Sequence, residues 1–155
     1  MRSHAIQIMI VAAAMFVLMP VAASASPGSL VIGVVTRGDG TVAGPVKVNI
    51  PGVVKLQLYD DVRVVDQELT IQAGGSTGWH SHPGPVLVTV KAGTFRYQES
   101  DCSFHDYTAG QTVIDSGGGH VHIGRNVGTV DVNLSLTFIV PPGAPLRIDV
   151  PAVDC

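Results

Sequence analysis

Two histidine pairs are the residues of this chain best suited to do chemistry. One residue separates His80 from His82, and one residue separates His120 from His122 later in the chain. Imidazole is the commonest metal-binding side chain in proteins, and residues i and i+2 of a strand point to the same face of a sheet. Both rings of a pair can therefore reach one point in space. The two pairs together predict two strands aimed at one metal ion.

Both pairs follow glycine-rich turns. The glycines concerned are Gly74, Gly75 and Gly78 before the first pair, and Gly117, Gly118 and Gly119 before the second. A single pair on a surface strand usually carries two solvated imidazoles, so one pair alone predicts little. Two pairs in similar settings, in a chain with 6 histidines, favour a shared metal site.

Strands must position these rings. Residues 130–140 alternate apolar and polar side chains, as a half-buried strand does, and residues 86–90 are rich in β-branched residues. The segment Arg37-Gly38-Asp39-Gly40 is typical of a turn. No segment has a helical period. Many short strands with Gly and Pro turns predict an all-β sandwich or barrel.

The spacing around the first pair resembles the first motif of the cupin family. Gly74, His80, His82 and Gly93 stand at motif positions, and Val86 stands where the motif carries a Glu. This Val is a departure from the pattern, so no acidic ligand is carried over to this chain.

The segment from Gly119 to Asn126 resembles the second cupin motif. The motif's final His falls on His122 and its Asn on Asn126, where it is expected to shape a turn. Gly117 stands in place of the proline expected two residues before the motif glycine. The resemblance covers roughly residues 62–140.

The resemblance implies a small antiparallel cupin β-barrel, or double-stranded jelly roll, with a metal ion in its mouth. It implies His80, His82 and His122 as ligands, and such a site suits a divalent Fe, Mn, Zn, Ni or Cu ion. His120 is the candidate for an extra ligand. If its segment is regular strand, it shares a face with His122; if it is still in the turn, it need not.

The N-terminus is typical of a cleaved signal peptide. An apolar run over residues 5–19 follows a weakly basic start, and Ala23-Ser24-Ala25 offers a small-residue cleavage site. We therefore expect residues 1–25 to be removed and residues 26–155 to form one domain, in a secreted or cell-envelope protein.

Export to an oxidising compartment would affect the state of the two cysteines. Cys102 and Cys155 are the only two, and an oxidising compartment favours a disulfide between them over two free thiols or a thiol near the metal.

A net charge of −3 without basic runs argues against nucleic acid and against anionic membrane surfaces as partners. A small-molecule ligand and a homodimer are compatible with the sequence.

Four further residues flank the histidines. Asp115 and Arg125 lie beside the second motif, where they can orient a ligand or lie on the surface. We expect the loop after Gln98 to carry Glu99 out to solvent, and we expect Trp79 to have a rim or core role.

Three functions fit these residues. The first is a secreted cupin-domain protein that binds a divalent metal, a small molecule or both. The second is a metal-dependent oxidoreductase of the dioxygenase kind, using a three-His site. The third is a structural cupin whose His cluster is vestigial. The sequence does not choose among them, because a fold does not give a function.

Overall fold

The computed structural model describes residues 24–155 of the chain. The expected signal peptide lies outside the described residues, apart from its last two positions, and stays a prediction. The described residues form twelve strands and no helix. In chain order these are β1 (Ser29–Val42), β2 (Val46–Ile50), β3 (Val54–Leu58), β4 (Val62–Ser76), β5 (His80–Ser81), β6 (Val86–Ala92), β7 (Thr94–Glu99), β8 (Phe104–Thr108), β9 (Thr112–Asp115), β10 (His122–Asn126), β11 (Val132–Val140) and β12 (Ile148–Asp149).

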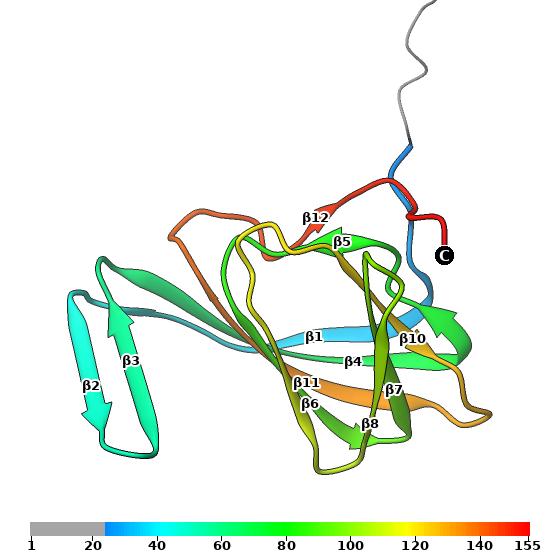
Figure 1. The fold of residues 1–155 in the computed structure, drawn as a ribbon, viewed down its shortest axis with the longest axis horizontal. Coiled ribbons are helices and arrows are strands. Elements are labelled where there is room, and N and C mark those ends of the chain that lie inside the picture. The colour runs from blue at the N-terminus through cyan, green and yellow to red at the C-terminus, as the bar shows by residue number, and fades with distance from the viewer. Residues whose placement is uncertain (1–23) are drawn as a thin grey trace, which may run out of the picture.

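Ten of the strands form one antiparallel sheet that curls into a nearly closed barrel (Figure 1). Its main path runs β12-β5-β10-β4-β11-β6-β9; β1 adds to β4, β7 to β10, and β8 to β7. The predicted all-β antiparallel barrel is confirmed. No helix of the described residues is long and apolar enough to cross a membrane.

The barrel core comes from strands that bury every second side chain. Along β11, Val132, Leu134, Leu136 and Phe138 are buried while the residues between them are only partly covered, as the sequence alternation predicts. Strand β6 alternates in the same way and pairs with β11. Burying one such side chain contributes about 1.5–3 kcal/mol to folding, so this ladder is a large part of the barrel's stability.

The predicted turn at residues 37–40 is wrong. Strand β1 runs straight through it, because the chain pairs there with the long strand β4. Asp39 lies opposite Val65 in that ladder, and its carboxylate accepts from Arg63 with an N–O distance of 2.6 Å. The register shifts between Thr36 and Gly38, so the glycine falls at a bulge in the strand and not at a reversal of the chain.

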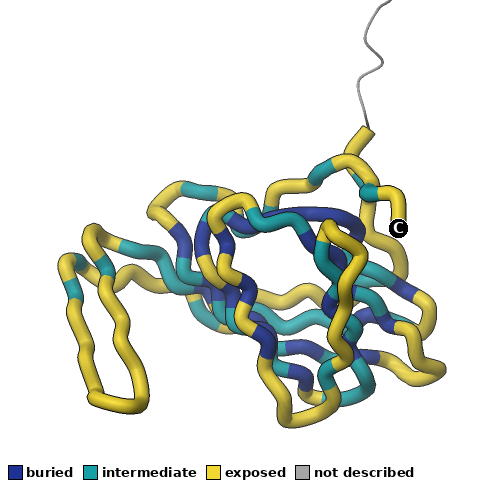
Figure 2. The backbone as a smooth tube through the Cα atoms, in the orientation of Figure 1, coloured by how far each residue is buried: buried dark blue, intermediate teal, exposed yellow. Residues whose placement is uncertain are grey.

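Strands β2 and β3 form a separate hairpin that projects from one end of the barrel (Figure 1). Nearly all of its residues are exposed (Figure 2). Both His80 and His122 lie on strands of the barrel, which follow this hairpin in the chain.

The C-terminal segment is fastened to the barrel at two points. Strand β12 pairs with β5, with Asp149 opposite His80. Cys155 forms a disulfide with Cys102, whose Cα atom lies 5.6 Å from that of Cys155, as the sequence predicts. The segment before the disulfide is thereby held across the histidine-bearing strand.

Candidate metal centre

The pairing of two very short segments brings the two histidine pairs together. Strand β5 lies between β10 and β12, and His80 is directly opposite His122 in the β5–β10 pair. Residues directly opposite each other in an antiparallel pair present their side chains to the same face. The register alone therefore places one ring of each pair side by side.

A close approach of two loops holds the backbone of His82 in place. The loop before the second pair touches the loop after the first, and a Cβ at Gly117 would come within 2.1 Å of the Gly84 backbone. Only glycine fits there, and its φ of +67° also favours glycine. The Gly119 amide then donates to the His82 carbonyl at 3.1 Å.

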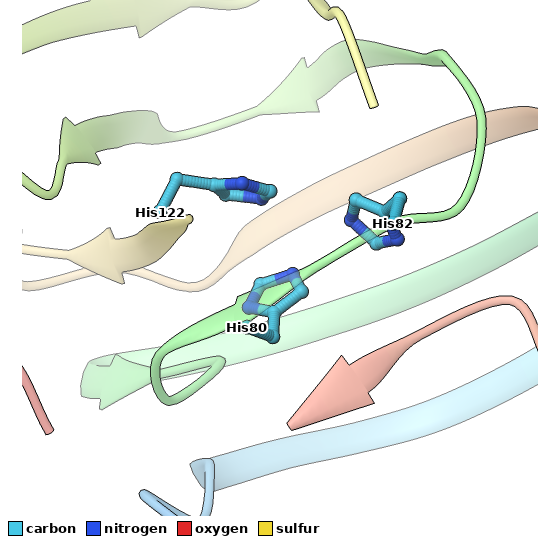
Figure 3. A group of neighbouring side chains, drawn as sticks. All are labelled: His80, His82 and His122. Atoms are coloured by element: carbon cyan, nitrogen blue, oxygen red, sulfur yellow. The ribbon is translucent and has the colours of Figure 1, made fainter. Parts of the chain in front are cut away.

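The three rings His80, His82 and His122 converge on one buried point (Figure 3). Each residue is about 5% exposed or less, and the ring centroids lie 4.3 to 5.2 Å apart. One ligand nitrogen from each ring lies within 4.8 Å of the ligand nitrogens of the other two. Nitrogens bound to one ion are expected within about 4 Å of one another, so this distance limit is wider than that expectation. A cavity of about 30 Å³ lies among the rings, which is room for an ion or a water molecule.

Hydrogen bonds set which nitrogen each ring offers. His80 Nδ1 lies 2.8 Å from the Gly78 carbonyl oxygen, and His82 Nδ1 lies 2.6 Å from that of Leu146. His122 Nδ1 lies 2.8 Å from an Asp115 carboxylate oxygen. Because all three partners are acceptors, each Nδ1 carries the hydrogen, and Nε2 is left with a free lone pair. Three Nε2 atoms form a donor set that suits a divalent transition metal.

Burial keeps the first two rings neutral. It lowers the pKa of His80 to about 2, with the nearby charges of His122 and Arg147 acting in the same direction. Burial likewise holds the pKa of His82 below its ordinary value. A metal displaces no proton from a neutral imidazole, so both rings are ready to coordinate at neutral pH.

Asp115 is the carboxylate behind His122. Its side chain is fully buried and accepts from the Tyr97 hydroxyl at 2.6 Å as well as from His122. Burial alone would raise the pKa of Asp115, but these hydrogen bonds outweigh it and hold the pKa below its usual range. The Tyr97 ring also stacks on His122, with centroids 4.7 Å apart. Of the two roles expected for Asp115, the structure shows the orienting one.

His120 lies outside the three-ring group. It precedes β10, still within the turn, and its Nε2 lies 2.6 Å from a Glu99 carboxylate oxygen. With Asp115 and His122 it makes a second cluster whose ligand atoms also lie within 4.8 Å of one another. Glu99 was expected in solvent, and that expectation is wrong: the β7–β10 pairing sets it opposite His122 and half-buries it against His120.

The chain forms an antiparallel barrel, and its clustered histidines stand at the positions of both cupin motifs. The chain has the cupin fold. No family model matches it, and no curated protein matches it.

Several solved structures are similar to part of the barrel. A double-stranded β-helix protein from Klebsiella pneumoniae is 22% identical with a TM-score of 0.49, over 56% of this chain and 75% of that one. A cupin domain from Bordetella pertussis is 22% identical with a TM-score of 0.44, over 49% and 80%. A cupin-like protein from Thermotoga maritima is 20% identical with a TM-score of 0.48, over 61% and 79%.

Val86, at the cupin Glu position, points into the barrel. It is fully buried within the apolar core and lies opposite Asp115 in the β6–β9 pair. The wall that carries a carboxylate in the motif is therefore apolar in this chain. The three-ring group has no acidic member among the described residues.

The remaining flanking residues have structural partners. Trp79 is buried, as expected for a rim or core side chain. Asn126 donates to the Ile71 and Val130 carbonyls and accepts from Gly128, which confirms its turn role. Arg125 donates to Gln98. Tyr97 and the Leu146 carbonyl were not predicted from the sequence. No local pattern marks them, because contacts between segments distant in the chain bring them to the rings.

Proposed function

We propose that this chain is an exported metal-binding cupin that holds one divalent transition metal ion on the Nε2 atoms of His80, His82 and His122. The observation that carries the proposal is the set of three buried rings whose Nδ1 atoms all face acceptors. A structural cupin needs no such uniform arrangement. Orienting partners of this kind accompany metal-ligating histidines in proteins generally.

The space and charge around the rings fit an ion. The cavity among them holds about one small occupant, and burial keeps His80 and His82 neutral. Three neutral ligands would leave a divalent ion with its full charge and with open positions for water or a ligand. The disulfide is compatible with export to an oxidising compartment.

A second candidate, a metal-dependent oxidoreductase, is favoured by one observation. A cavity of about 420 Å³ adjoins the rings and shares His80 and His82 with the smaller one. This volume is within the range of small-molecule sites. A metal bound by three imidazoles would supply Lewis acidity or redox chemistry there, and this chain's residues would bind and orient the substrate.

Metal analysis of tag-free protein tests the binding function. The protein is incubated with Fe²⁺, Mn²⁺, Zn²⁺, Ni²⁺ or Cu²⁺, desalted and measured by mass spectrometry for metal per chain. We expect one ion per chain for at least one metal, and a loss of that ion in His82→Ala. The matched control is His105→Ala, because His105 is exposed on β8 and outside the group. Protein that retains none of the five metals would overturn the proposal.

A further inference from the structure

The larger cavity beside the rings is where a ligand would sit. Its volume is about 420 Å³, and His80, His82 and Thr77 line both this cavity and the small one among the three rings. A molecule in the larger cavity can therefore reach the point on which the rings converge. The volume is at the lower end of the range for small-molecule sites, which points to a compact ligand.

Most of the cavity wall is apolar. Its lining includes Leu136 and Phe138 of β11, Leu69 of β4, and Leu30 and Val34 of β1. Leu30 is 53% exposed and Val34 is 55% exposed, although both face a concave site. An apolar ligand body would cover this surface, and each buried methylene group would contribute about 0.8 kcal/mol.

One cation stands at the histidine end of this apolar wall. Arg147 lines the cavity together with His80, and its Nη2 donates to the Thr77 carbonyl at 2.6 Å. Its Nε donates to Asp149. A guanidinium has five N–H donors, and these two bonds use two of them. Arg147 is thus held in position by Thr77 and Asp149 with donors to spare.

We propose that this cavity binds a small amphipathic monocarboxylate, with its carboxylate between Arg147 and the histidine centre and its apolar body along β1 and β11. A guanidinium matches a carboxylate in geometry and charge. A divalent ion on three neutral imidazoles would add a second positive group at the same end. The metal half of this proposal rests on the proposed function; the Arg147 half does not.

Asp149 limits the charge that the site accepts. Its carboxylate offsets Arg147, lines the same cavity and would repel a dianion more strongly than a monoanion. The apolar wall likewise disfavours highly charged ligands such as phosphates, because it offers their oxygens no hydrogen-bond donors.

Calorimetric titration with hexanoate tests the ligand class. Acetate has the same headgroup without the apolar chain, and 1-hexanol has the chain without the charge. We expect hexanoate to bind at least about tenfold more tightly than either, since four methylenes separate it from acetate and a charge-assisted hydrogen bond separates it from hexanol. Equal affinities for hexanoate and acetate, or for hexanoate and hexanol, would overturn the proposal.

Two variants of the Arg147–Asp149 pair test the placement of the carboxylate. Arg147→Gln should weaken hexanoate binding by about tenfold or more, because it removes the charged donor. Asp149→Asn should strengthen it, because it removes the competing carboxylate. Both variants break the same ion pair, so a merely structural role would shift affinity in the same direction for both, and that result would contradict the proposal. Arg37→Gln, on the exposed face of β1, is the control and should leave affinity unchanged.

Separate metal measurements keep this proposal distinct from the proposed function. Each titration is run on metal-free protein and on protein incubated with Zn²⁺, with bound zinc measured directly. If none of the five metals tested above binds while hexanoate binds and responds to Arg147→Gln, the metal function is wrong and the carboxylate site stands. If zinc binds while hexanoate does not, the metal function stands and the carboxylate site is wrong.

Discussion

The two histidine pairs look alike in sequence and differ in the folded chain. His80 and His82 both turn into the barrel and join one group. Of the second pair only His122 does so; His120 stays outside and contacts Glu99. Identical spacing therefore gives two ligands in one place and one ligand in the other.

Backbone pairing accounts for the difference. Strand β10 begins at His122, and the His120 amide still donates to the Gly117 carbonyl at 3.2 Å, which is a turn contact. The rule that residues i and i+2 share a face holds only along a strand, so it does not apply to His120. His82 also lies just beyond its strand, but its ring donates to the Leu146 carbonyl and its own carbonyl accepts from Gly119. Hydrogen bonds to neighbouring segments replace strand geometry there.

The largest expected effect is a difference in zinc affinity between variants of His122 and of His120, the two members of the second pair. His122→Ala should lower zinc affinity at least about hundredfold, more than the loss of an outer partner does, because it removes one of three ligands. His120→Ala should lower it by no more than about threefold, since its ion pair with Glu99 is partly exposed and of small energetic weight. Competition against a chromophoric chelator measures both. Losses of equal size would place the ion in the Asp115–His120–His122 cluster.

Substitution of Asp115 should have the next largest effect on zinc affinity. Asp115→Asn should lower zinc affinity about 10- to 100-fold, because the amide no longer fixes the hydrogen on His122 Nδ1 and no longer strengthens its Nε2 as a donor. The exposed Asp131→Asn is the control. An unchanged affinity would mean that Asp115 serves the fold and not the metal centre.

Val86 tests the apolar wall beside the first pair. Val86→Glu adds an oxygen donor inside the barrel and should raise the affinity for Fe²⁺ or Mn²⁺ about tenfold. It should also lower the unfolding free energy of the metal-free protein by about 2 kcal/mol or more, since the new carboxylate is buried near Asp115. Val86→Gln is the matched variant of the same size, with a smaller stability loss because its amide is uncharged, and with little gain in metal affinity. If both variants bind these metals as wild type does, the side chain at position 86 does not reach the ion.

The last of these effects is a pH dependence of the stability of the metal-free protein. The pKa of His80 is about 2 in the folded chain, from a normal value of 6.5. Below pH 6.5 the unfolded chain therefore binds a proton that the folded chain does not, so stability falls as the pH falls from about 6.5 towards 4.5. Denaturant unfolding at several pH values measures this, and His80→Gln should flatten the curve. A flat wild-type curve would contradict the buried neutral state of His80.

The sequence predicted the parts that follow from periodicity and motif spacing. The alternation along β11 depends on strand geometry, and it is confirmed. The Cys102–Cys155 disulfide is also confirmed. The turn at residues 37–40 was wrong because local glycine signals compete with a long pairing partner, here β4, that no local pattern reveals.

The parts of the candidate site that the sequence did not predict depend on long-range pairing. Tyr97 reaches Asp115 from β7, and Leu146 reaches His82 across the C-terminal segment. Glu99 was placed wrongly because the loop after β7 looked polar, whereas the β7–β10 register sets it opposite His122. Contacts between residues so distant in the chain leave no signature in spacing or composition.

An anomalous diffraction map of zinc-loaded crystals tests the central claim most directly, because it locates the ion without reference to affinity. The account predicts one strong peak about 2.1 Å from the Nε2 atoms of His80, His82 and His122, with His120 still against Glu99. A peak between His120 and Asp115 would contradict it, and so would the absence of a peak at the three histidines in crystals loaded with each of the five metals.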